Sequence, residues 1–248
     1  MSSIAELRIG DAKYELPIIK GTEGEKGIDI SSLRAQSGHI TLDKGFKNTG
    51  STKSAITFLN GEEGVLRYRG YSIEELSSDS SFLEVSYLLI YGELPTIEQL
   101  NYFSNDISSH TLVHEDVKSI LDGFPSRAHP MGVLSSLVSS LTAFYPKSLD
   151  PNRSVEEING TIIRLLAKLP TLAAWSYKNR MRQPVMYPNN NLDYTSNFLH
   201  MMFGLPTSES NVDPIIAKAL DKLLILHADH EQNCSASTVR IVGSSHAS

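Results

Sequence analysis

The chain contains 248 residues, enough for one large domain or two smaller ones around a sizeable core. It is 40% hydrophobic and 20% charged, and its net charge of −6 comes with no basic run, which argues against a nucleic-acid partner. The single cysteine, Cys234, excludes an internal disulfide framework, and no apolar stretch approaches the roughly 20 residues that cross a membrane. These features predict a soluble protein of the cytoplasm.

Residues 1–70 are predicted to form a β-rich segment. They hold 10 of the 16 glycines, and glycine favours tight turns. Apolar and polar residues alternate on both sides of Gly10 and Asp11, which predicts a first hairpin. A second hairpin is expected around Asn60 and Gly61, with residues 56–59 pairing with 65–68.

From about residue 72 the sequence has a helical period. Four pairs have the spacing of a capping box: Ser72 with Glu75, Ser81 with Glu84, Thr96 with Gln99, and Ser154 with Glu157. Apolar residues recur three and four apart over 113–124, 133–144 and 155–169. Prolines, Pro170 among them, are expected to separate the helices. Residues 71–248 are therefore predicted to be a helical domain, incomplete at its C-terminal end, and the fold to be mainly α.

A further helix is predicted to begin at Asp213 and Pro214, an N-cap followed by proline at the first helical position. Its apolar stripe consists of Ile216, Leu220, Leu223 and Leu224, and His227 continues the stripe. We expect this face, with the His227 ring, to point into the core.

Two short motifs favour structural interpretations. Residues 45–52 come within one residue of the phosphate-binding loop pattern but lack its lysine, so an exposed glycine-rich loop is expected. His110 and His114 lie four apart on a predicted helix, as two ligands of one metal would. The residues between them do not fit the H-E-x-x-H pattern, and both are interpreted as histidines of a helix surface.

The stretch 226–238 has four ionisable residues within five positions: His227, Asp229, His230 and Glu231. The residues alone allow three interpretations. The stretch is a polar helix end with His227 in the core, or a metal site made by the two histidines and a carboxylate. The third is an anion site, in which an imidazolium near a helix end binds a carboxylate by a charge-assisted hydrogen bond.

The run ILHADHEQNCSASTVR closely resembles the segment of citrate synthases in which a histidine binds oxaloacetate, and His230 matches that histidine. Four earlier segments also resemble the bacterial pattern, in the same order: ITFLNGEEGVLRYRGYSIEEL, FLEVSYLLIYGELPT, HPMGVLSSLVSSLTAFY and RLLAKLPTLAAWSYK. The resemblance covers essentially the whole chain. It implies the N-terminal portion of a helical large domain, preceded by a β-rich segment like that of the Gram-negative branch.

The resemblance implies an acyltransferase that condenses acetyl-CoA with oxaloacetate to citrate and needs no cofactor or metal. In that family an aspartate removes a proton from the acetyl methyl group while a histidine donates to the carbonyl oxygen. The GP-x-HGGAN-type motif of that histidine does not occur in these 248 residues, and His129 and His246 do not match it. No catalytic residue is therefore predicted here, and the chain by itself is expected to be inactive.

Members of the Gram-negative branch tend to be hexamers inhibited by NADH. His110, Tyr145, Arg164 and Lys168 resemble positions of that allosteric site, but Ser109 replaces the arginine that commonly precedes the histidine. Ordinary roles on helix surfaces are the alternative for these four residues. The resemblance also implies self-association, as the family dimer or hexamer.

Two other functions fit the same residues. A 2-methylcitrate synthase resembles a citrate synthase but uses propionyl-CoA. A non-catalytic helical interaction protein, built on a truncated enzyme scaffold, is the alternative outside enzymes. In the gene, an HGGAN-type motif soon after the codon of Ser248 would favour an enzyme, and a stop codon would favour the interaction protein.

Overall fold

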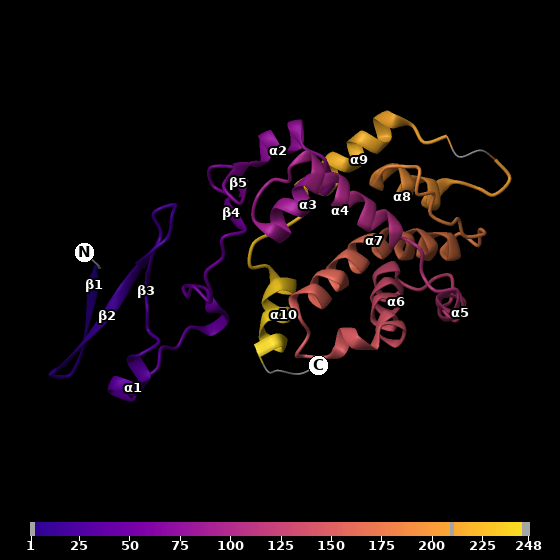
Figure 1. The fold of residues 1–248 in the computed structure, drawn as a ribbon. Coiled ribbons are helices and arrows are strands. Elements are labelled where there is room, and N and C mark those ends of the chain that lie inside the picture. Colours follow the sequence, from indigo (N-terminus) through magenta and orange to yellow (C-terminus); the bar gives the residue numbers. More distant parts are fainter. Residues whose placement is uncertain (1–2, 209–210, 245–248) are drawn as a thin grey trace. The chain divides into compact units, whose positions relative to one another are not determined.

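The computed structural model describes residues 3–208 and 211–244, so His246 lies outside the described residues. The chain divides into two compact units, Met1–Ser54 and Ala55–Ser248 (Figure 1). This division differs from the boundary expected at residue 70, because the second hairpin packs with the helices: Tyr68 lies in one core cluster with Leu76, Leu88 and Ile225.

The first unit contains an antiparallel sheet in the order β1 (Ile4–Ile9), β2 (Ala12–Lys20), β3 (Lys26–Ile28). The hairpin expected around Gly10 is confirmed, with Ile9 opposite Ala12. Gly10 has φ +64°, in the left-handed region that favours glycine. The short helices α1 (Leu33–Ser37) and η1 (Lys44–Phe46) follow.

The second unit begins with the other expected hairpin, β4 (Thr57–Asn60) and β5 (Val65–Tyr68), in which Thr57 lies opposite Tyr68. The two-residue strand β6 (Tyr71–Ser72) pairs with β5. The helices that follow are α2 (Ile73–Asp79), α3 (Phe82–Tyr91), α4 (Ile97–Ser109), α5 (Asp116–Asp122), α6 (Pro130–Phe144), η2 (Pro146–Leu149), α7 (Val155–Arg180), α8 (Tyr194–Phe203), α9 (Pro214–Leu226) and α10 (Cys234–Ser244).

The local helix signals are confirmed. All four capping boxes form, at the starts of α2, α3, α4 and α7. Asp213 caps α9, where its Oδ1 accepts a hydrogen bond of 2.8 Å from the Ile215 amide. The fold is mainly α, as predicted. None of the helices in the described ranges has both the length and the apolar character of a membrane span.

The expectation that Pro170 separates two helices is wrong, because Pro170 lies inside α7. Proline has no amide hydrogen, so the carbonyl four residues earlier loses its helical partner. That carbonyl belongs to Leu166, and the hydroxyl of Tyr194 on α8 donates to it at 2.9 Å. A residue distant in sequence thus satisfies the free carbonyl, which helps the helix to continue to Arg180.

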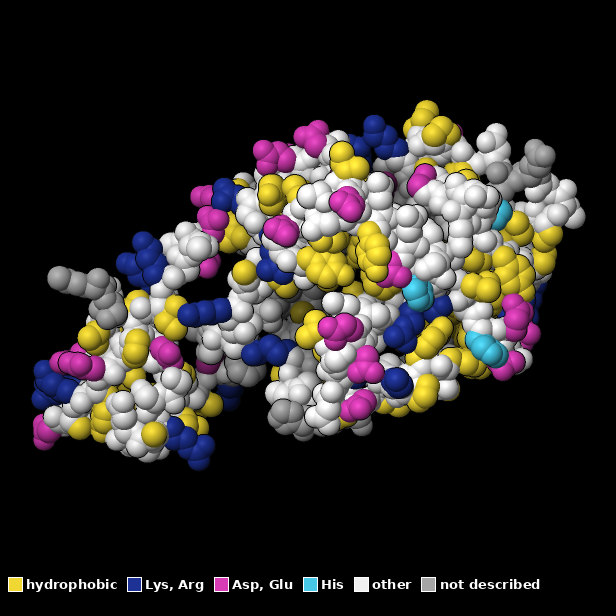
Figure 2. Space-filling model, in the orientation of Figure 1, with side chains coloured by type: hydrophobic (Ala, Val, Ile, Leu, Met, Phe, Trp, Pro, Cys, Tyr) yellow, Lys and Arg dark blue, Asp and Glu magenta, His cyan; other side chains and the backbone are white. Residues whose placement is uncertain are grey.

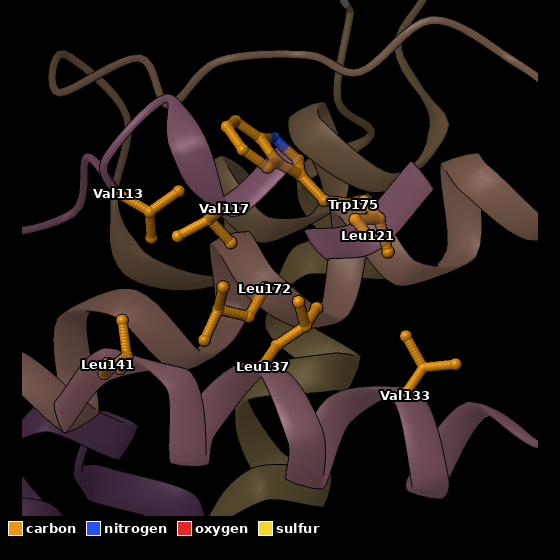
Figure 3. Packing of buried hydrophobic residues seen from close by; sticks show 8 residues of the cluster. All are labelled: Val113, Val117, Leu121, Val133, Leu137, Leu141, Leu172 and Trp175. Atoms are coloured by element: carbon orange, nitrogen blue, oxygen red, sulfur yellow. The ribbon is translucent and has the colours of Figure 1, made fainter. Parts of the chain in front are cut away.

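The main core of the second unit lies between α5, α6 and α7, where side chains from three segments converge (Figure 3). Leu137 on α6 and Leu172 and Trp175 on α7 are completely buried. The Trp175 indole Nε1 donates to the Met186 carbonyl at 2.8 Å, so its polar atom is satisfied. Leu137 and Leu172 lie on facing sides of this core, which joins α6 to α7.

Candidate functional site

The stretch around His230 is placed by α9, which is attached to α2 and α3. The Asp221 carboxylate accepts from the Phe82 amide, the first of α3, at 3.1 and 3.2 Å. Burial is the main cause that raises the pKa of this carboxyl group. Lys222 Nζ donates to the Ser77 carbonyl at 2.7 Å, and Ile225 is completely buried. One face of α9, from Asp221 to Ile225, is therefore held against the neighbouring helices.

The face of α9 that we expected in the core is not the most buried one, so that prediction is wrong in part: Leu220 and Leu224 are partly buried, but Ile216, Leu223 and His227 are exposed. Ile216 and Leu223 are 55% and 52% exposed. His227 is also exposed; it is the C-cap of α9, and its Nδ1 lies 2.7 Å from the Leu223 carbonyl oxygen. The most buried face carries Ala217 and Ile225 instead, and Asp221 contacts α3 beside it.

His230 lies in the loop 227–233 between α9 and α10, with its side chain exposed. The His227 and His230 rings meet edge to face, with centroids 6.0 Å apart. Asn233 caps α10, because its Oδ1 accepts from the Ala236 amide at 2.8 Å. The α10 N-terminus, which carries partial positive charge, therefore begins four residues after His230. An exposed imidazole near such a terminus suits an anionic ligand.

Unlike the His230 side chain, the Asp229 side chain is partly buried and hydrogen-bonded within the protein. Its carboxylate accepts from Thr57 Oγ1 at 2.5 Å and from the Glu231 amide at 2.9 Å. Among residues 3–208 and 211–244, no three His, Cys, Asp or Glu side chains gather as they would around a metal ion. The exposed His230 and the hydrogen-bonded Asp229 thus differ in their surroundings.

The structure brings together the four residues that resemble an NADH site. The Arg164 guanidinium lies over the Tyr145 ring, 4.8 Å from its centroid, and Lys168 Nζ lies 5.7 Å from the same centroid. Lys168 Nζ also donates to the carbonyls of His110 and Leu112 at 2.7 and 2.5 Å. Tyr145, at the C-cap of α6, is thus covered by two cations from successive turns of α7.

The four residues are not equivalent. Lys168 is only 3% exposed, and burial, with the nearby Arg164 charge, lowers the pKa of its amine. Through these two hydrogen bonds its ammonium holds the segment after α4 against α7. Arg164 Nε donates to the Gly160 carbonyl at 2.8 Å, and His110 Nδ1 lies 2.8 Å from the Asp106 carbonyl oxygen. A role in NADH binding stays a prediction from the resemblance, and Lys168 has a structural role in either case.

The interpretation of His110 and His114 as two histidines of one helix is wrong. His110 is the C-cap of α4, and His114 lies in the following loop, where its ring stacks on Phe144 at 4.7 Å. The helix expected over 113–124 is shorter, since α5 begins at Asp116.

The family model described as "Citrate synthase, C-terminal domain" matches residues 45–248, which is most of the chain. The chain belongs to the citrate synthase family. It is 52% identical over 243 residues to "Citrate synthase 1" of two Mycobacterium tuberculosis strains, CDC 1551 / Oshkosh and ATCC 25618 / H37Rv. The match covers 98% of this chain and 56% of each relative, so the chain spans about half the length of these citrate synthases.

Solved structures of the family agree with the fold. The citrate synthase of Pyrobaculum aerophilum matches with a TM-score of 0.74 and 30% identity, over 93% of this chain and 54% of that chain. The citrate synthase of Thermotoga maritima MSB8 matches with a TM-score of 0.69 and 26% identity, over 84% of this chain and 52% of that chain. The expected citrate synthase-like helical architecture is confirmed.

Proposed function

We propose that the chain forms part of an enzyme that condenses acetyl-CoA with oxaloacetate to citrate and CoA in the cytoplasm. Membership of the citrate synthase family supports this reaction. The observation that carries the proposal is the exposed His230, in a loop between α9 and the start of α10. In this proposal its imidazolium binds an oxaloacetate carboxylate by a charge-assisted hydrogen bond. The aspartate and histidine that transfer protons come from residues that these 248 do not include.

Rates measured on the complete enzyme test this proposal. Thiol release from acetyl-CoA should depend on oxaloacetate, whereas the 248-residue chain alone should match the blank without enzyme, because each missing acid–base group removes about 10²–10⁴-fold. The complete enzyme should also turn over acetyl-CoA faster than propionyl-CoA. A preference for propionyl-CoA would identify a 2-methylcitrate synthase. Turnover by the 248-residue chain would contradict the assignment of proton transfer to other residues, and an inactive complete protein would favour the interaction scaffold.

Self-association is the second part of the proposal. Apolar side chains are exposed over the helical unit (Figure 2), among them Ile216 and Leu223 on α9 and Met131 at the start of α6. An apolar cavity of about 330 Å³ lies between the start of α6 and the end of α7, lined by Pro130, Leu134 and Tyr177 among others. Exposed apolar patches beyond a few hundred Å² generally contact another surface. A second copy of the chain is the occupant that a family of oligomers favours.

We expect the purified chain to be a dimer or a larger species at micromolar concentration. Light scattering coupled to size exclusion measures this mass directly. Met131→Glu, at the edge of the cavity, should shift the population toward monomer, because a carboxylate resists burial in an apolar contact. Glu74→Lys, an equally drastic charge change in the first turn of α2, is the control. A monodisperse monomer at every concentration, with no dye-binding apolar surface, would contradict self-association.

A further inference from the structure

The loop that carries His230 is attached to a hairpin far away in the sequence. Thr57 on β4 donates from Oγ1 to Asp229 Oδ2 at 2.5 Å. Tyr68 on β5 donates its hydroxyl to the Asp229 carbonyl at 3.1 Å and accepts from the Asp229 amide at 3.3 Å. Because Thr57 and Tyr68 are opposite each other in the hairpin register, both side chains project from the same face.

Tyr68 is fixed in the core of the second unit. Tyr68 is completely buried in the cluster that also contains Ile225, the last buried residue of α9. Burial, together with the Asp229 carboxylate, raises the pKa of the Tyr68 phenol, so the hydroxyl keeps its proton and can donate. The hairpin and the end of α9 therefore share one core, and this core holds the Tyr68 hydroxyl in place for its hydrogen bonds with Asp229.

The contacts fix the backbone on both sides of His230. The same Asp229 oxygen that binds Thr57 also accepts from the Glu231 amide at 2.9 Å. Glu231 has φ +50°, a left-handed conformation that costs free energy in a residue other than glycine. The carboxylate thus holds this conformation, and residues 229 and 231 are both fixed while the side chain between them remains exposed.

We propose that Thr57 and Tyr68 are positioning residues for the substrate contact of His230, and that they act through Asp229. This inference rests on the proposed function, in which His230 binds an oxaloacetate carboxylate. An exposed side chain on a free loop would have to be ordered each time the substrate binds. The three residues Thr57, Tyr68 and Asp229, the hairpin clamp, order the loop before binding, so less binding free energy is lost.

Removing the Thr57 hydroxyl in the complete enzyme tests the hairpin clamp. Thr57→Val keeps the shape of the side chain and should weaken oxaloacetate binding by about 3- to 10-fold, since one hydrogen bond to a carboxylate is lost. Thr57→Ser keeps a hydroxyl and should bind nearly as the wild type does. Tyr68→Phe keeps the buried ring and should weaken binding as Thr57→Val does. The KM for acetyl-CoA should stay within about twofold in all three variants, because the clamp acts on one substrate.

Asn60→Ala is the matched control for general damage to the hairpin. Asn60 Oδ1 accepts from the amides of Glu62 and Glu63 in the hairpin turn and does not bind the His230 loop. This variant should lower the melting temperature without changing the dissociation constant of oxaloacetate, measured by calorimetric titration. The inference is wrong if Asn60→Ala weakens oxaloacetate binding as much as Thr57→Val does.

His230→Ala separates the two hypotheses. If it weakens oxaloacetate binding while Thr57→Val and Tyr68→Phe leave the affinity unchanged, the hairpin clamp is overturned and the proposed function stands. If His230→Ala itself has no effect on oxaloacetate, the assignment of the substrate contact is wrong.

Discussion

Replacing His230 by alanine in the complete enzyme should weaken oxaloacetate binding by about 10- to 150-fold. A hydrogen bond to a charged group contributes about 1.5–3 kcal/mol, and each 1.4 kcal/mol is a tenfold change in affinity. The melting temperature should change little, because the side chain is exposed. Calorimetric titration with oxaloacetate measures the affinity, and a thermal melt of the same sample measures the stability.

His227→Ala is the matched control, three residues earlier and also exposed. Its imidazole contacts the Leu223 carbonyl and the edge of the His230 ring, so a loss of less than about threefold in oxaloacetate affinity is expected. This expectation replaces the buried role that the sequence pattern indicated for His227. Equal losses in the two variants would mean that the loop as a whole, and not His230, determines binding. Wild-type affinity in His230→Ala would remove His230 from the site.

The helix starts and hairpins that the sequence predicts correctly depend on residues that are close together in the chain. Ser154 and Glu157 are three residues apart, and their reciprocal bonds form whenever that turn is helical. Thr57 and Tyr68 face each other because a short turn fixes the register of the hairpin. The prediction for Pro170 is wrong because the deciding contact is not local. The carbonyl that it frees is satisfied by Tyr194, 28 residues from Leu166, and no local pattern reveals such a partner.

The candidate site was predictable only in part. Spacing left three interpretations of the 226–238 stretch open, and the resemblance to citrate synthases selected His230. The exposure of His227 could not be predicted from the apolar stripe of α9, because the buried face carries Ala217 and Ile225 and is held by tertiary contacts such as that of Asp221 with the Phe82 amide. The contact of Thr57 with Asp229 could not be predicted from the sequence, since the two residues are 172 positions apart and threonine is common in strands.

The four residues with the NADH resemblance illustrate the same limit. The sequence left two alternatives open for Arg164 and Lys168, a part in an NADH site or ordinary roles on a helix surface. It did not reveal that Lys168 is buried and donates to two carbonyls, while Arg164 lies over the Tyr145 ring. The Lys168 ammonium can be buried because the carbonyls of His110 and Leu112 replace water as its partners.

Replacing Trp175 by alanine should lower the free energy of unfolding of the helical unit by about 3–5 kcal/mol, the usual cost when a large aromatic side chain is removed from a core. Trp175 is completely buried between α5, α6 and α7 (Figure 3), and its ring meets the Tyr187 ring edge to face at 5.7 Å. The variant would also leave the Met186 carbonyl without its indole donor. Because Trp175 is the only tryptophan, urea unfolding should be followed by far-ultraviolet circular dichroism.

Two variants separate the contributions to this loss. Trp175→Phe keeps an apolar ring but loses the indole donor and part of the volume, so its cost should be smaller, about 1–3 kcal/mol. Leu165→Ala, on the same helix but 43% exposed, should cost less than about 1 kcal/mol. Comparable losses in Leu165→Ala and Trp175→Ala would mean that the cluster around Trp175 is not the main core. A midpoint of Trp175→Ala near that of the wild type would mean that α6 and α7 are joined mainly by other contacts, since Trp175 is the largest completely buried side chain among the described residues.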